Sequence, residues 1–295
     1  MYYFLSLLSA ALISIMIVIN GTLTKSYDIF LAGVMIHLVG FTALTLWMFL
    51  RKKRFFRPSL PWFLYTGGAL GVITTFLSNI TYGTIGVCAI VALGLLAQSV
   101  TSLIIDHFGF WGMPVKKMTG WKFGGLIFTL FGIIILLKGS TFSFFPVLFS
   151  LLIGITIIIS RFSNAALAKK TSVFNSTWYN YVVGLTISFI IWISMLKTGY
   201  SSIPSHCAPS LWIYTGGLLG VAVILLSNLC TIKIPAFLMT LTLFIGQVFT
   251  GIFLDILLGQ LPSMQYVLGG LITTAGLCFN LFLEKNHIKA TCNDH

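Results

Sequence analysis

Long stretches of apolar residues alternate along this chain with short segments that carry most of the charged side chains. Between Pro58 and Ile105, for example, no Asp, Glu, Lys or Arg occurs. A helix needs about 20 mostly apolar residues to cross the roughly 30 Å hydrocarbon core of a bilayer, so this one stretch is long enough to cross twice. The pattern predicts an all-α polytopic membrane protein.

Applied to the whole chain, the same criterion predicts ten transmembrane helices. A signal peptide is not expected at the start, because the run from Phe4 to Asn20 has no basic segment before it. The predicted spans, with boundaries good to about two to four residues, are 4–20, 28–50, 62–80, 84–106, 120–138, 143–162, 174–196, 210–229, 234–257 and 265–283.

Two of these helices contain nearly the same sequence. "YTGGALGVITTFLSN" at 65–79 recurs as "YTGGLLGVAVILLSN" at 214–228, with ten of the fifteen positions identical. Apolar residues alone would satisfy a membrane helix, so the recurrence of Tyr, Thr, Ser and Asn indicates a duplication. This offset of 149 also pairs Gln98 with Gln247, Asp106 with Asp255 and Asn79 with Asn228, and an offset of 144 pairs Asn20 with Asn164, His37 with Tyr181 and Gly40 with Gly184.

Each copy contains five predicted helices, in residues 1–140 and 141–295. Because five is odd, the second copy must enter the bilayer from the opposite face, which gives two inverted five-helix repeats. This arrangement is typical of secondary transporters, whose two near-equivalent halves open one central site to either side in turn. The spacings Gly67-x-x-x-Gly71 and Gly216-x-x-x-Gly220 further predict close packing of helix backbones.

Composition agrees with a membrane location. The chain is 58% hydrophobic and 7% charged, with a mean hydropathy of +1.03, which a water-soluble surface could not tolerate. The net charge of +12 does not indicate nucleic-acid binding, because the basic residues lie between apolar runs. With both termini cytoplasmic, all 17 Lys and Arg residues except Lys25, Lys138 and Lys197 face the cytoplasm, which fits the positive-inside rule for a protein of the cytoplasmic membrane.

Catalytic and metal chemistry have no recognisable sequence pattern. The five cysteines show neither paired spacing nor an associated His pattern, so no metal site or cofactor is expected. Phosphate-binding loops and nucleophile–base arrangements are absent as well. We therefore expect a protein that is not an enzyme and has no catalytic residues.

Gln98 and Gln247 are the leading candidates for contact with a substrate. Each lies eight residues before an acid, about 12 Å along a helix, which carries it toward the centre of the bilayer. An amide both donates and accepts hydrogen bonds and suits a polar neutral or zwitterionic ligand. The alternative is that both glutamines hold neighbouring helices together.

Two further sets of polar residues are repeat-related, and polar groups in hydrocarbon need a partner or a function. Asn79, Asn228, Asp106 and Asp255 lie near the ends of their helices and form candidate gates at the two faces, with helix capping as the alternative. Asn20, Asn164, His37 and Tyr181 are further substrate-contacting candidates, and His37 is also a candidate proton carrier. The alternative for His37 is a satisfied core residue.

Several stretches together resemble the YdcZ-type branch of the drug/metabolite transporter superfamily, in its fused ten-helix form. They are "NGTL" at 20–23, the His37-x-x-Gly40 spacing, "YTGGALGV" at 65–72 and "LLAQSVTSLIIDHFG" at 95–109. The second half departs from this pattern, with Tyr181 in place of the histidine. The resemblance implies that helices one to four and six to nine surround a central cavity, with helices five and ten outside it.

The sequence thus predicts a secondary transporter that moves a small organic metabolite or drug by alternating access. A membrane channel or a lipid flippase or scramblase is the alternative. Expected partners are the small-molecule substrate and membrane lipid. Proton coupling would have to run through Asp106, Asp255 or His37, and facilitated diffusion or exchange is the other option. The protein is expected to be a monomer or a homodimer.

Overall fold

Helices form the regular structure in the part of the chain that the structure, a computed structural model, describes. That part comprises residues 1–53, 55, 60–81, 84–85, 87–112, 115, 143–204 and 210–257, together with isolated positions in 124–135 and 264–279. The long helices are α1 (Tyr2–Ser26), α2 (Ile29–Leu50), α3 (Thr66–Thr81), α4 (Val87–Phe108), α6 (Phe144–Lys170), α7 (Val173–Thr198), α8 (Gly216–Thr231) and α9 (Ala236–Leu257). Short 3₁₀ turns precede α3 and α8, as η1 (Trp62–Tyr65) and η3 (Leu211–Thr215), and η2 (Phe110–Gly112) follows α4.

Seven helical segments of the described residues are long and apolar enough to cross a membrane. A shorter apolar stretch, Leu93–Phe108, lies in α4. The prediction of an all-α polytopic membrane protein is confirmed. The predicted helices at 120–138 and 265–283 lie mostly outside the described residues.

The prediction for the sixth helix was wrong at its end. It was expected to stop at residue 162, but α6 continues to Lys170. Arg161 is expected from the sequence to face the cytoplasm, yet its side chain and that of Asn164 are buried and do not interrupt the helix. Lys169 and Lys170 provide the basic last turn that favours a helix C-terminus.

Local capping chemistry fixes two short connections. Asp28 begins α2, where its Oδ1 accepts the backbone N–H groups of Phe30 and Leu31, both at 2.8 Å. Ser172 begins α7 in the same way, by accepting the N–H of Asn175 at 3.1 Å. These caps let the chain reverse within two residues, so α1 and α2 are antiparallel, as are α6 and α7.

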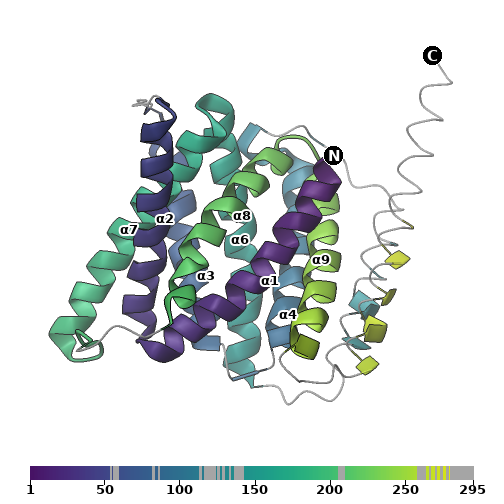
Figure 1. The fold of residues 1–295 in the computed structure, drawn as a ribbon. Helices are drawn as coiled ribbons and strands as arrows, with labels where there is room; N and C mark the ends of the chain where they lie inside the picture. The colour runs from purple at the N-terminus through teal and green to yellow at the C-terminus, as the bar shows by residue number, and fades with distance from the viewer. Residues whose placement is uncertain are drawn as a thin grey trace.

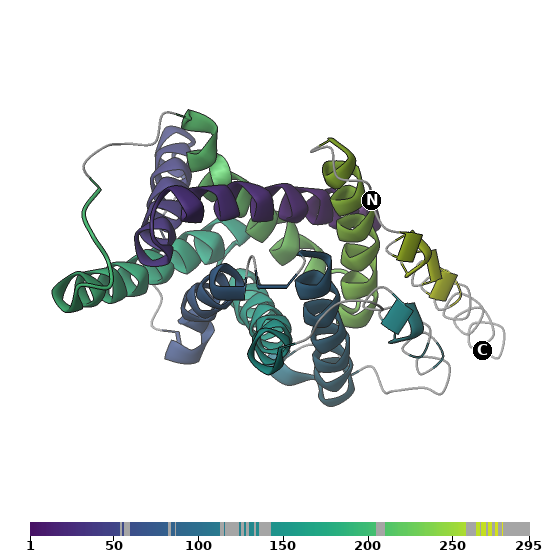
Figure 2. The same ribbon diagram turned by 90° about the horizontal axis from the view of Figure 1, so that it is seen from below.

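Contacts between the halves fix the relative direction of their helices. Figure 1 shows α2 beside α7 at one side of the bundle and α4 beside α9 at the other. The rings of Trp47 and Phe174 stack with their centroids 4.5 Å apart, and His37 Nδ1 lies 3.3 Å from Ser188 Oγ. The later residue of α2 thus meets the earlier residue of α7, so the two helices are antiparallel. Since each of these helices is antiparallel to the one before it, α1 and α6 also run in opposite directions. The view in Figure 2, turned by 90°, shows α1 passing across this bundle.

Glycines allow two close helix crossings with the same geometry. Gly68 of α3 packs on the backbone of α7. A Cβ built on Gly68 would lie only 3.0 Å from the backbone nitrogen of Gly184. Its repeat mate Gly217 of α8 packs on α2 in the same way, because a Cβ built on Gly217 would lie 2.8 Å from the backbone nitrogen of Gly40. The predicted Gly67-x-x-x-Gly71 packing face is wrong, because Gly71 faces open space with nothing within 4 Å.

Candidate functional site

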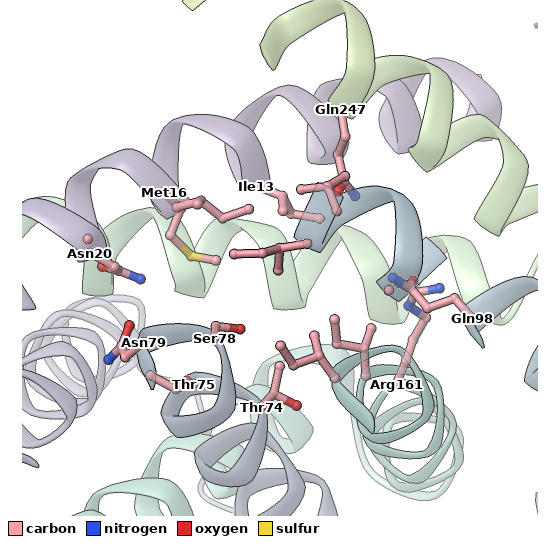
Figure 3. A pocket seen from close by; sticks show the side chains of 17 residues that line it. Ile13, Met16, Asn20, Thr74, Thr75, Ser78, Asn79, Gln98, Arg161 and Gln247 are labelled. Atoms are coloured by element: carbon pink, nitrogen blue, oxygen red, sulfur yellow. The ribbon is translucent and has the colours of Figure 1, made fainter. Parts of the chain in front are cut away.

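A cavity of about 160 Å³ lies between α1, α3, α4 and α6, with one residue from α9. Most of its lining is apolar, Asn20 and Asn79 lie at one end, Gln98 and Arg161 lie at the other, and Thr74 and Thr75 of α3 lie between them (Figure 3). The apolar lining consists of Ile13, Met16, Ile17, Ile90, Val91, Ile153 and Ile157.

One end of the cavity is formed by α1 and α3. Asn20 and Asn79 both face this end, and Ser78 lies beside them (Figure 3). Neither amide is fully satisfied within the described residues, because Asn20 Oδ1 and Asn79 Nδ2 are buried without a hydrogen-bond partner. Unpaired buried amide atoms are costly, so this end is suited to a polar guest.

The other end carries Gln98 of α4, Arg161 of α6 and Gln247 of α9. Gln98 and Gln247 are 4% and 7% exposed, so both side chains are buried between helices. Arg161 is also only 7% exposed, and its Nη2 donates to Gln98 Oε1 at 3.4 Å. Figure 3 shows the two side chains adjacent, pointing to the same end of the cavity.

Arg161 is the site residue that sequence reasoning missed. It was counted among the residues facing the cytoplasm, and this was wrong, because it lies within α6 and lines the cavity. Its repeat mate is Ile17, which lines the same cavity, so the comparison of the halves offered no polar pair to draw attention to it. The available signal was its position inside an apolar helix, where an ionisable residue indicates function.

Asn164 and Asn228, the mates of Asn20 and Asn79, do not line the cavity. They belong to a buried polar cluster on α6, α7 and α8, which we call the asparagine cluster: Asn164, Ser176, Thr177, Asn180 and Asn228. Asn164 Nδ2 donates to Asn180 Oδ1 at 2.8 Å, Ser176 donates to the Asn164 carbonyl at 2.6 Å, and Asn228 Nδ2 donates to Thr177 Oγ1 at 3.3 Å. Asn228 Oδ1 has no partner within the described residues. The two asparagines of the second half thus donate hydrogen bonds within a buried cluster, whereas their mates in the first half border the cavity.

His37 and Tyr181 lie at the crossing of α2 and α7, outside the cavity lining. His37 Nδ1 donates to the Gly33 carbonyl at 2.8 Å, since a carbonyl can only accept. Tyr181 donates its hydroxyl to the Gly217 carbonyl at 3.1 Å. Both side chains are buried and hydrogen-bonded to backbone, which is the arrangement of core residues.

Asp106 of α4 is buried, and its side chain lies beside the start of α9. Its Oδ2 accepts the backbone N–H of Phe237 at 3.1 Å, so the carboxylate of one helix caps another. The side chain of Asp255 lies outside the described residues. Of the ten sequence-predicted site residues, the cavity brings together four: Asn20, Asn79, Gln98 and Gln247.

The helical fold, with seven described segments long and apolar enough to cross a membrane, is that of a polytopic membrane protein. The family comparison agrees, because the sequence model of the DMT_YdcZ family, described as "Putative inner membrane exporter, YdcZ", matches residues 1–135 and 145–283. These two segments cover nearly the whole chain, and the protein belongs to this family, as its sequence motifs predicted. It is a multi-pass membrane protein of a family of membrane transporters.

Solved structures resemble the chain in fold. One of them, titled "Crystal structure of protein", has a TM-score of 0.68 with 15% sequence identity, over 97% of this chain and 96% of that chain. At this level of identity the likeness concerns the fold alone. Among curated proteins, no match is found.

Proposed function

We propose that this protein is a secondary transporter that carries a small organic solute by alternating access. The observation that carries the proposal is the difference between two repeat-related asparagine pairs. Asn20 and Asn79 border the cavity, whereas Asn164 and Asn228 donate hydrogen bonds within the asparagine cluster, away from the cavity. We interpret these as the open and the closed form of the same gate.

The relation between the two halves supports this interpretation. The first helices of the halves run in opposite directions, and Gly68 and Gly217 pack on the opposite half in the same way. The family model also matches one segment in each half. Two such halves can exchange conformations, which closes the Asn20 end while the asparagine cluster opens.

The rival functions fit the cavity less well. A channel needs both gates open at once, and a lipid scramblase needs a polar groove that faces lipid. Gln98 and Gln247 are instead buried between helices and face the cavity. Their location supports a central site over a groove that faces lipid.

Cysteine accessibility tests alternation without knowledge of the substrate. Ser78 lines the cavity, and its repeat mate Ser227 is buried beside Asn228. In a variant whose five native cysteines are replaced by serine, S78C should react with a membrane-impermeant maleimide from one face only, and S227C from the other face only. When N20C and N79C are introduced together and their thiols are cross-linked before labelling, labelling of S227C should increase. Labelling of S227C that is unaffected by the cross-link would contradict alternating access.

A further inference from the structure

Arg161 carries a charge that the protein leaves without a counter-ion in the described part of the chain. Its side chain is 7% exposed, its Nη2 donates to the neutral amide of Gln98, and its Nη1 atom is buried without a partner. Arginine remains protonated in proteins, so this is a buried cation. A buried charge without a partner is strongly unfavourable, which requires an explanation.

The described carboxylates are occupied elsewhere. Asp28 caps α2 and accepts the hydroxyl of Ser201 at 2.6 Å, and Asp106 accepts the N–H of Phe237. No carboxylate among the residues that the structure describes contacts the Arg161 guanidinium. Within the described residues the protein thus supplies no counter-ion, and the cavity that Arg161 lines is a place where an anion can reach it.

We propose that the cavity binds a small organic monoanion, a short-chain carboxylate whose carboxyl group is held by Arg161. This inference rests on the proposed function and specifies its substrate class. A guanidinium offers paired N–H donors that match the two oxygens of a carboxylate. The side-chain amides of Gln98 and Gln247, at the same end, can donate to the remaining lone pairs.

The rest of the cavity favours an apolar chain behind the carboxylate. Ile13, Ile17, Ile153 and Ile157 line the cavity, and Thr74 and Thr75 are the polar residues of α3 among them. A volume of about 160 Å³ is well below the roughly 300–1,000 Å³ of sites for drug-sized ligands, so a large drug does not fit. Arg161 is the sole Lys or Arg in the described lining, which matches one negative charge and disfavours phosphate dianions.

Binding can be tested with defined probes on the purified full-length protein in detergent. Sodium butanoate and hexanoate are compared with butanamide, hexanamide and butylammonium chloride at constant ionic strength, and the thermal unfolding midpoint is followed. The two carboxylates should raise the midpoint in a saturable manner, because they bind the folded state alone, and the amides and the amine should not.

Variants then assign the effect to Arg161. Arg161→Gln should weaken carboxylate binding by about 10- to 100-fold, the loss expected for a hydrogen bond to a charged group. Arg161→Lys keeps the charge without the paired donors and should retain part of the response. The same change at the exposed Arg51, R51Q, removes one positive charge outside the cavity and should leave the response intact.

Three results would overturn the proposal: no response of the wild-type protein to either carboxylate, an equal response to the amides, or an undiminished response in R161Q. If R161Q does not fold, the comparison of acid with amide and the R161K variant still decide. The outcome is independent of the cysteine test. Carboxylate binding through Arg161 without alternation of S78C and S227C would leave the anion site standing and refute the transport cycle, and the reverse result would refute the anion site alone.

Discussion

Gly67 of α3 lies directly against the side-chain amide of Asn164 of α6, with no room for a methyl group between them. The repeat-related residues have the same relationship, because Gly216 of α8 lies against the amide of Asn20 in α1. In both places an asparagine of the first helix of one half rests on the backbone at the start of the third helix of the other half. Glycine is required there because any Cβ would displace the amide.

A methyl group at Gly67 should therefore destabilise the protein. Gly67→Ala forces Asn164 out of its place in the asparagine cluster, and overpacking of this kind typically costs about 1–3 kcal/mol. Gly71→Ala, in the same helix, is the matched control, because nothing lies within 4 Å of its added Cβ. Thermal unfolding in detergent should show a lower midpoint for G67A and an unchanged or slightly higher one for G71A. Equal midpoints would contradict the packing described here.

The helices could be predicted from sequence because a bilayer requires every backbone polar group to be satisfied within a helix, so spans follow from apolar length. The same rule failed at the end of α6. There, the expectation that Arg161 faces the cytoplasm places the helix end too early, because Arg161 and Asn164 are buried polar residues within the span. Hydropathy measures how strongly a side chain prefers water to an apolar medium. It does not show whether a neighbouring helix offers that side chain a hydrogen-bond partner.

A sequence gives the position of a residue along its helix, at 1.5 Å per residue, but not the direction in which its side chain points. Gln98 and Gln247 line the cavity. His37 is equally deep in its helix but faces the crossing of α2 and α7, against Gly184. Which face of a helix turns inward depends on packing between helices, and the sequence of a nearly uniformly apolar helix does not encode it visibly.

Replacement of Asp106 distinguishes a structural cap from a proton-carrying group. Asp106→Ala removes the acceptor for the Phe237 N–H and should cost about 0.5–2 kcal/mol in stability. Asp106→Asn keeps an acceptor oxygen and should retain most of that stability, because asparagine caps helices as well as aspartate does. The measurement is the thermal midpoint of both variants. A stable D106N protein with wild-type midpoint that no longer alternates in the cysteine assay would instead assign the carboxylate to the transport cycle.

His37 should contribute to stability and not to ligand selection. His37→Leu loses the hydrogen bond to the Gly33 carbonyl and leaves that buried carbonyl with one partner fewer, a cost of about 0.5–1.5 kcal/mol. In His37→Asn the amide nitrogen takes the place of Nδ1, so part of the stability should return. The unfolding midpoint measures this difference. Both variants should keep the wild-type response to butanoate, and a lost response would place His37 in the binding site.

Opening of the asparagine cluster is the step that the transport cycle requires, so weakening it should favour the alternate state. Asn180→Ala removes the acceptor of the 2.8 Å hydrogen bond from Asn164 and leaves a buried amide unpaired, which costs about 1–3 kcal/mol. The substitution therefore destabilises the closed form of this gate. The open form is not destabilised, because water can hydrogen-bond to Asn164 there.

We therefore expect N180A to increase the rate at which S227C reacts with maleimide from its own face and to decrease the rate for S78C. Thr186→Ala is the control on the same helix, since Thr186 is exposed and its hydroxyl donates to the carbonyl of Val182, at 2.8 Å within α7. It should leave both rates unchanged. If N180A raises the labelling of S78C and S227C together, the change reflects general loosening of the bundle and the two gates are not coupled. A rise at one position with a fall at the other is the signature of two ends that cannot open at the same time, because one rigid exchange of the halves links them.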